Sequence, residues 1–133
     1  MKRAIASDRA PKAVGPYSQA VAFGHLLFCA GQIPLDPVTG DLVGEDVTAQ
    51  TERVIENIKS VLTVNAMTLS DVVKTTVFLT KMDDFAAMNT VYARHFSEPF
   101  PARSTVAVCA LPRGARVEIE VTAAKEAANG SKA

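Results

Sequence analysis

The sequence contains none of the patterns that mark most metal, nucleotide or covalent chemistry. It has no Cys-x-x-Cys, His-Glu-x-x-His or EF-hand spacing, and its two histidines, His25 and His95, have no partner at ligand spacing. We therefore expect no metal site. A glycine-rich phosphate loop, a Gly-x-Ser-x-Gly elbow and a Cys/His nucleophile arrangement are also missing. These absences argue against nucleotide cofactors and covalent catalysis, so any reaction is expected to need no cofactor.

An excess of one charge is also missing. The 14 Lys and Arg residues balance the 14 Asp and Glu residues, and no long run of like charges occurs. A nucleic-acid partner is therefore not expected. No apolar run could span a membrane, and residues 1–5 are too short for a signal peptide, so we expect a cytoplasmic protein without a membrane partner. The two cysteines, Cys29 and Cys109, lie in apolar runs and are expected to be buried free thiols.

Hydrophobic residues make up 48% of the 133 residues, which fits one compact domain. We place this domain at residues 1–125 and expect a flexible, small and polar tail at 126–133. Strands are predicted at 2–5, 19–23, 26–30, 72–80, 104–110 and 116–124. The apolar spacing predicts one helix from Asp46 or Thr48 to about Val64, ended by a left-handed Asn65. A second helix is predicted to be capped by Asp83 or Asp84 and stopped by Pro99.

The order β-β-β-α-β-α-β-β predicts an α+β fold, with two helices on one face of a single sheet. Neither face of the strands at 72–80 and 104–110 is polar. The helices can cover one face only. The other face is therefore expected to be covered by self-association.

Arg103 is the most informative candidate for a functional side chain. It follows Pro99 and Pro101 and precedes an apolar strand, so the rigid backbone would hold its guanidinium at the mouth of the sheet. A planar fork of donors at such a place can bind a carboxylate or a phosphate. The alternative is a surface charge without a function.

The last strand alternates strictly, with Val117, Ile119 and Val121 on one face and Glu118 and Glu120 on the other. A solvated outer face is the simpler interpretation. The functional hypothesis is that one glutamate looks into a pocket beside Arg103, where a carboxylate could hold a water.

Three further candidates carry weaker signals. Tyr17 follows a Gly-Pro pair in a loop, where it is either a packing residue or a hydroxyl donor at a pocket rim. Gly31 follows an apolar strand and would allow a ligand to approach the backbone. Asn89 lies on the second helix, where an exposed side chain is the simpler interpretation.

Five segments stand in the order seen in the RidA (YjgF-like) family, which the sequence resembles from about residue 5 to residue 124. They are residues 13–20 (AVGPYSQA), 30–34 (AGQIP), 71–79 (DVVKTTVFL), 101–104 (PARS) and 117–120 (VEIE). The resemblance implies a chorismate-mutase-like (bacillus type) subunit with a mixed sheet, and a homotrimer with sites in the clefts between subunits.

The resemblance also implies an activity, the hydrolysis of 2-iminobutanoate and 2-iminopropanoate to 2-keto acids and ammonia. Such imines are released by pyridoxal-phosphate-dependent dehydratases. In the family pattern, Arg103 binds the substrate carboxylate and Glu118 positions the water. The pattern also assigns substrate contacts, namely a hydroxyl from Tyr17, a backbone contact at Gly31, the side chain of Asn89 and the backbone amide of Thr105.

The sequence departs from the family pattern at three positions. Ala30 stands where many relatives have serine, and Ala66 where a helix-ending glycine is common. Thr105 replaces a reactive cysteine of some relatives, so thiol modification at that position is excluded. Other activities stay open, namely RNA cleavage with translation inhibition, non-catalytic keto-acid sensing, and a chaperone role for the apolar surface.

Overall fold

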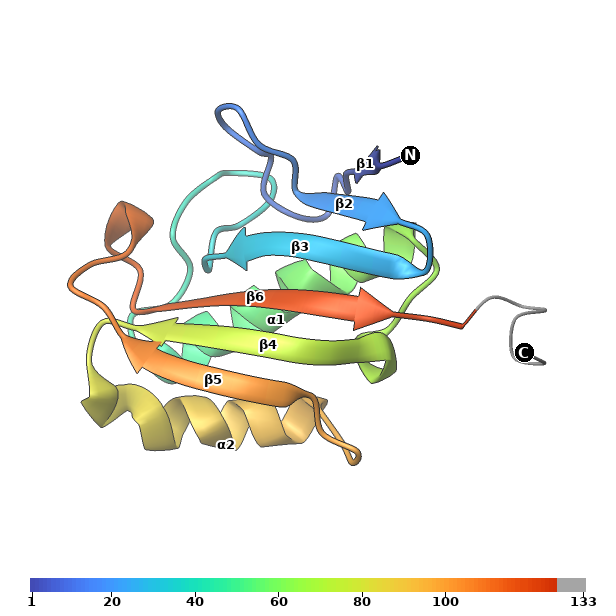
Figure 1. The fold of residues 1–133 in the computed structure, drawn as a ribbon. Helices are drawn as coiled ribbons and strands as arrows, with labels where there is room; N and C mark the ends of the chain where they lie inside the picture. Colours follow the sequence, from blue (N-terminus) through green and yellow to red (C-terminus); the bar gives the residue numbers. More distant parts are fainter. Residues whose placement is uncertain (127–133) are drawn as a thin grey trace.

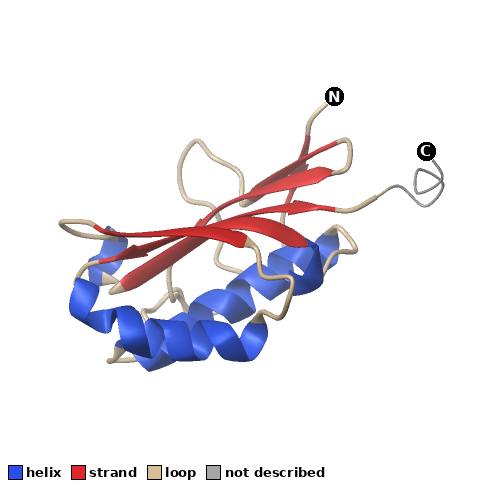
Figure 2. Ribbon diagram, turned by 60° about the horizontal axis from the view of Figure 1, so that its bottom comes forward, coloured by secondary structure: helices blue, strands red, loops and turns tan. Residues whose placement is uncertain are grey.

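One six-stranded mixed sheet forms the frame of the molecule, and both helices pack on the same face of it (Figures 1 and 2). The computed structural model describes residues 1–126. Its strands are β1 (Arg3–Ile5), β2 (Ala20–Phe23), β3 (Leu26–Gln32), β4 (Val72–Leu79), β5 (Ala102–Ala107) and β6 (Val117–Ala124). The strand order is β1-β2-β3-β6-β4-β5; β4 and β5 are parallel, and the other neighbours are antiparallel. The predicted α+β architecture is confirmed.

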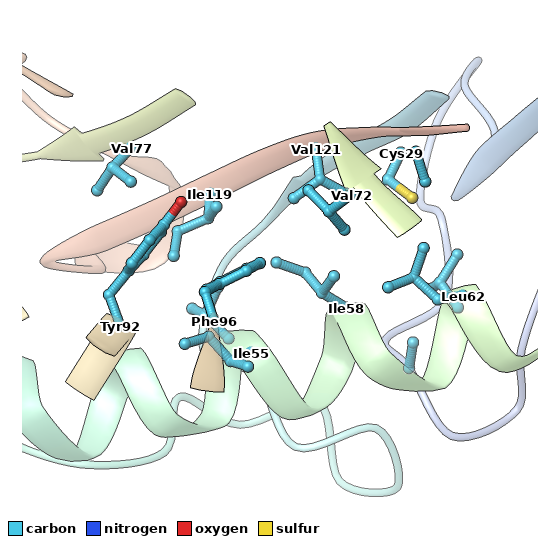
Figure 3. Close-up of a cluster of buried hydrophobic side chains, with 14 of the residues drawn as sticks. Cys29, Ile55, Ile58, Leu62, Val72, Val77, Tyr92, Phe96, Ile119 and Val121 are labelled. Atoms are coloured by element: carbon cyan, nitrogen blue, oxygen red, sulfur yellow. The ribbon is translucent and has the colours of Figure 1, made fainter. Parts of the chain in front are cut away.

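The core lies between the sheet and the helices α1 (Val47–Val64) and α2 (Phe85–His95). In α1, the predicted apolar stripe is fully buried: Val54, Ile55, Ile58, Val61 and Leu62. Figure 3 shows Ile55, Ile58 and Leu62 of this stripe below Ile119 and Val121 of β6, with Tyr92 of α2 and Phe96, the residue after α2, beside them. The rings of Tyr92 and Phe96 are stacked with their centroids 4.3 Å apart, and both are buried at the C-terminal end of α2.

Asp46 caps α1, as predicted, because its Oδ1 accepts a hydrogen bond from the Ala49 amide at 2.8 Å. The prediction for the other end of α1 is wrong. Asn65 has φ −99°, and the left-handed residue is Ala66, with φ 57°. The turn comes one residue later because the amide of Met67 donates to Leu62 O at 3.0 Å. Lys125, far away in the sequence, also donates to Ala66 O at 2.7 Å.

The second helix starts where predicted, since Asp84 is the N-cap residue of α2, but the expected capping bond is absent. A 3-10 turn (Met82–Asp84) leads into α2, and the Asp84 side chain makes no capping bond there. Its carboxylate instead forms an ion pair with Arg116 at 2.9 Å. The helix ends at His95, before Pro99 is reached, and Phe96 is already extended. Two further 3-10 turns lie at Leu69–Asp71 and Pro112–Gly114.

Strand β5 ends at Ala107, three residues earlier than predicted. Cys109 therefore lies in the following loop and is exposed, contrary to expectation. Cys29 is buried, as expected, and its burial raises the pKa of the thiol to about 12. Strand β3 runs to Gln32, so Gly31 lies inside it rather than after it.

The face of the sheet opposite the helices is open (Figure 2). It leaves Phe23, Phe28 and Val106 exposed by 55%, 46% and 42%, which is the uncovered apolar face expected from the sequence. Within residues 1–126, no helix is both long and apolar enough to cross a membrane. The expected flexible tail falls, from residue 127 on, outside the described residues.

Candidate active site

Arg103 lies on β5, the edge strand of the sheet, and its side chain packs on α2. The register pairs Arg103 with Thr75 of β4, whose side chain is buried on the helix-covered face. The guanidinium carbon lies 4.7 Å from the centroid of the Tyr92 ring and 5.5 Å from that of Phe85. Its Nη1 donates to Asn89 Oδ1 at 2.7 Å. Two aromatic faces and one amide oxygen thus fix the orientation of the guanidinium.

Phe85, Asn89 and Tyr92, here called the Arg103 cradle, occupy one face of α2 at spacing i, i+4 and i+7. Asn89 was a candidate from the sequence, and the structure brings it to Arg103. Phe85 and Tyr92 were not among the candidate site residues. Their helical spacing was visible in the sequence, but nothing there indicated that an arginine from another strand would lie on them.

Tyr92 is held in turn by the sheet. Its hydroxyl and Thr75 Oγ1 are 2.8 Å apart and share a hydrogen bond. Burial raises the pKa of the Tyr92 phenol, although the bond to Thr75 and the charge of Arg103 oppose this shift. The phenol therefore stays neutral, and it offers Arg103 a ring face rather than a negative charge.

A hollow of about 400 Å³ opens beside the guanidinium. It is lined by Asn89, Tyr92, Ala93, Phe100, Pro101 and Arg103. A guanidinium has five N–H donors, and within residues 1–126 Arg103 uses one in a side-chain hydrogen bond. The donors that are left can bind an anion, and the planar fork matches the two oxygens of a carboxylate.

Thr105 lies two residues beyond Arg103 on the same face of β5. The amide of Val108 donates to Leu79 O of the neighbouring strand at 2.8 Å. Because successive amides point to opposite edges of a strand, the Thr105 amide points to the free edge, where it could contact a ligand. Within residues 1–126, the buried Thr105 Oγ1 has no hydrogen-bond partner.

Glu118 lies on the opposite face of the sheet. It pairs with Phe78 of β4, whereas its neighbours Val117 and Ile119 point into the core. The carboxyl group is half-buried, and its pKa is raised, first by burial and then by the nearby charge of Glu120. Within residues 1–126, no side-chain hydrogen bond compensates for the burial of Glu118. An unpaired carboxylate with a raised pKa is suited to accept a proton.

Gly31 lies directly beneath the Glu118 carboxyl group. A Cβ at this position would lie 2.0 Å from Glu118 Oε2 and 2.8 Å from its Cδ. The register of β3 and β6 shifts between Cys29 and Gln32, and this irregularity brings the glycine backbone under the carboxyl group. The close approach expected at Gly31 is thus present, and the group that approaches it is a side chain of the same chain.

Two expectations about this site are not met in one copy of the chain. In the strand pairing, Arg103 lies beside Thr75 of β4, and Glu118 lies beside Phe78 of the same strand. Thr75 and Phe78 are three residues apart, so Arg103 and Glu118 point to opposite faces of the sheet. The prediction that a glutamate lies beside Arg103 is therefore wrong within one copy of the chain. Tyr17 is 55% exposed on the loop before β2, and its side chain makes no hydrogen bond to Arg103 or Glu118 among the described residues.

No group of three or more His, Cys, Asp or Glu side chains within the described residues could hold a metal ion.

Residues 7–125 match a family model described as Endoribonuclease L-PSP. The chain is 44% identical over 128 residues to the 2-iminobutanoate/2-iminopropanoate deaminase of Salmonella typhimurium, covering 94% of this chain and 99% of that protein.

Solved structures are similar over nearly the whole chain. A putative endoribonuclease from Thermotoga maritima has a TM-score of 0.92 and 54% identity, and the match covers 96% of this chain and all of that one. A member of the Rid protein family from Yersinia pestis has a TM-score of 0.91 and 48% identity, with 94% of this chain and all of that one covered.

Proposed function

The chain belongs to the RidA family, and we propose that it is a cofactor-free hydrolase that converts 2-imino acids to 2-keto acids and ammonia. The single observation that carries this proposal is the Arg103 cradle. It orients a guanidinium beside a hollow of about 400 Å³, as the capture of a small carboxylate requires. The name of the Salmonella relative supports 2-iminobutanoate and 2-iminopropanoate as the substrates.

In this proposal, Arg103 holds the substrate carboxylate by two charge-assisted hydrogen bonds. The Thr105 amide adds a donor at the free edge of β5, and Asn89 keeps the guanidinium in place. Gly31 offers a backbone contact, and Tyr17 supplies a hydroxyl at the rim. The roles of Thr105, Gly31 and Tyr17 follow the family pattern. That pattern makes Asn89 a substrate contact, and the bond from Arg103 to Asn89 supports the positioning role proposed here in addition.

Glu118 serves as the base in this proposal. Because it lies on the other face of the sheet from Arg103, one copy cannot present both groups to one substrate. We therefore propose a homotrimer in which each cleft takes Arg103 from one copy and Glu118 from the next. The exposed apolar side chains of the open face support such an assembly.

The chemistry needs one water, and Glu118 carries one proton in each of two steps. In the first step, Glu118 removes a proton from the water as the water oxygen bonds to the C=N carbon, the C=N electron pair moves to the nitrogen, and Glu118 passes that proton to the nitrogen. A tetrahedral carbinolamine forms. In the second step, Glu118 removes the proton of the carbinolamine hydroxyl as the C=O bond forms and passes it to the nitrogen, which leaves as ammonia when the C–N bond breaks. Acid–base catalysis contributes a factor of about 10²–10⁴ in such steps.

These substrates would be supplied by pyridoxal-phosphate-dependent dehydratases, which release unstable imines. A cytoplasmic location belongs to the same proposal. Imines also hydrolyse in water without a catalyst, so positioning and acid–base assistance would be enough.

A second candidate function is RNA cleavage, which is favoured by the description of the matched family model. The balance of 14 basic and 14 acidic residues argues against it. Salt-sensitive RNA cleavage that survives Arg103→Ala would support this candidate over the deaminase.

The decay of 2-iminobutanoate, generated in situ, tests the proposal with the wild type and Arg103→Ala. Loss of the guanidinium leaves the carboxylate unpaired in a desolvated cleft, which costs about 3–5 kcal/mol, so catalysed decay should fall below detection. The matched control is Arg9→Ala, which removes an exposed arginine outside the site. Equal rates for the wild type and Arg103→Ala would refute the assignment.

A further inference from the structure

One partly buried ion pair, between a buried Asp84 and an Arg116 side chain that is 36% exposed, lies outside the residues that the proposed mechanism uses. Arg116 Nη2 lies 2.9 Å from Asp84 Oδ1, and Arg116 Nε lies 3.3 Å from Oδ2, so the fork grips both carboxylate oxygens. Asp84 is 8% exposed. This pair joins the start of β6 to the start of α2, two elements more than thirty residues apart in the sequence.

Each residue of the pair immediately precedes an element that carries part of the site. Asp84 precedes α2, which begins with Phe85 and carries the whole Arg103 cradle. Arg116 precedes β6, whose second residue is Glu118. Two residues of a strand span about 6.6 Å, so a displacement of the backbone at Arg116 would also displace Glu118.

Arg116 is also anchored to the elements around it. Its amide donates to Gln50 Oε1 of α1 at 2.8 Å, and its Nη1 donates to Glu45 O at 3.2 Å. The carbonyl of Arg116 accepts from the amide of Thr80, just after β4, at 3.2 Å. The pair is therefore the point at which α1, α2, β4 and β6 are held in one arrangement.

Stability alone gives a weak reason for a partly buried ion pair at this point. Removing two charges from water is costly, and apolar side chains of similar volume often stabilise a protein as well or better. Asp84 could also cap α2, yet its carboxylate makes no capping bond. The carboxylate instead binds Arg116, immediately before β6.

We propose that Arg116 and Asp84 are positioning residues for imine hydrolysis, which fix the Arg103 cradle and the Glu118 strand in register. This inference rests on the proposed function. In the proposed assembly, each copy gives Arg103 to one cleft and Glu118 to another, so the pair would set the geometry of both clefts that the copy serves. A displacement of about 1 Å in a reacting group can cost a factor of about 10² in rate.

The test uses Arg116→Met, Asp84→Leu and the double variant in the full-length protein. Arg116→Met leaves the buried Asp84 carboxylate unpaired, and Asp84→Leu leaves the half-exposed Arg116 without its partner. Each variant therefore lowers the unfolding temperature, Arg116→Met by more, and each lowers kcat/KM for 2-iminobutanoate by about 10- to 100-fold. The double variant replaces the pair by two apolar side chains. Its unfolding temperature should return toward the wild-type value, whereas its kcat/KM stays at least about tenfold low.

Two further variants complete the design. Arg116→Lys keeps the charge but loses the two-pronged geometry, and its kcat/KM should fall between those of the wild type and Arg116→Met. Glu52→Gln is the matched control, because Glu52 bonds Arg94 and His95 at the other end of α2. It should lower the unfolding temperature while leaving kcat/KM within about twofold of the wild type.

Recovery of kcat/KM together with stability in the double variant would overturn the positioning role. So would a loss in Glu52→Gln as large as that in the single variants. Absence of imine hydrolysis in the wild type would instead refute the proposed function, and the two failures are therefore distinguishable.

Discussion

The two faces of the sheet hold their functional side chains in contrasting ways. On the helix-covered side, Arg103 lies against two aromatic rings and donates to Asn89 at 2.7 Å. On the open side, Glu118 is half-buried over the backbone of Gly31, and no side chain of residues 1–126 satisfies it. The fold thus orients a cation on one face and leaves an anion uncompensated on the other.

The difference corresponds to two different tasks. An oriented guanidinium gains its function from fixed geometry, since a carboxylate is bound best by a fork that is already in place. A carboxylate becomes a better base when its negative charge is buried without a partner, because burial raises the pKa of the carboxyl group and so favours proton uptake. Variants of Arg103 should therefore affect binding, and variants of Glu118 should affect turnover.

The largest expected effect is that of Glu118→Gln. The amide keeps the shape of the side chain but cannot accept the proton of water, so kcat should fall by about 10²–10⁴ while KM changes little. Steady-state imine decay at several substrate concentrations separates the two constants. The control is Glu120→Gln, the exposed glutamate on the same face. A rise in KM at constant kcat would mean that both faces serve binding.

Gly31→Ala should have the next largest effect. The new Cβ would lie 2.0 Å from Glu118 Oε2, so the carboxyl group must move away. Such a displacement should lower kcat by about 10- to 100-fold. Gly24→Ala is the control, because Gly24 has φ 59° and open space around its Cα; that variant should lose stability alone. Unchanged kcat in Gly31→Ala would show that the position of the carboxyl group is unimportant.

The pH dependence sharpens the contrast further. Below its pKa, Glu118 is protonated and cannot act as a base, so kcat/KM should fall as the pH falls through that pKa. Burial and the charge of Glu120 raise the pKa of Glu118, so this acid limb should lie above the ordinary range of a glutamate. Glu120→Gln removes one cause and should move the limb to lower pH. A limb that does not move, or moves upward, would contradict the assignment.

Much of this contrast could be predicted from local patterns. The alternation of β6 placed Val117, Ile119 and Val121 in the core and Glu118 on the other face, as observed. The spacing in α1 predicted its buried stripe in the same way. Period-2 and period-3.6 patterns are decided within one element, so they can be predicted without knowing the neighbours.

Contacts between elements could not be predicted in this way. The bond from Arg103 to Asn89 depends on β5 lying beside α2, and the Asp84 side chain leaves its predicted capping role because Arg116 comes from a distant strand. The left-handed residue after α1 was predicted to be Asn65 but is Ala66, whose carbonyl accepts a hydrogen bond from Lys125. In each case, tertiary structure overrides a local preference.

Two threonines with buried hydroxyls give the smallest expected effects, and they compare a hydrogen-bonded hydroxyl with an unpaired one on the helix-covered side. Thr75 Oγ1 shares a hydrogen bond of 2.8 Å with the Tyr92 hydroxyl, whereas Thr105 Oγ1 has no partner within residues 1–126. Thr75→Val leaves a buried phenol unpaired and should lower the free energy of unfolding by about 1–3 kcal/mol.

Thr105→Val removes a hydroxyl that is already unpaired, so the free energy of unfolding should stay constant or rise by up to about 1 kcal/mol. Urea unfolding of both variants, followed at the same protein concentration, provides the measurement. If Thr105→Val is as costly as Thr75→Val, the Thr105 hydroxyl has a partner in solution. Because β5 is an edge strand, that partner would come from a second copy of the chain, and the loss should then disappear when the protein is diluted until the copies separate.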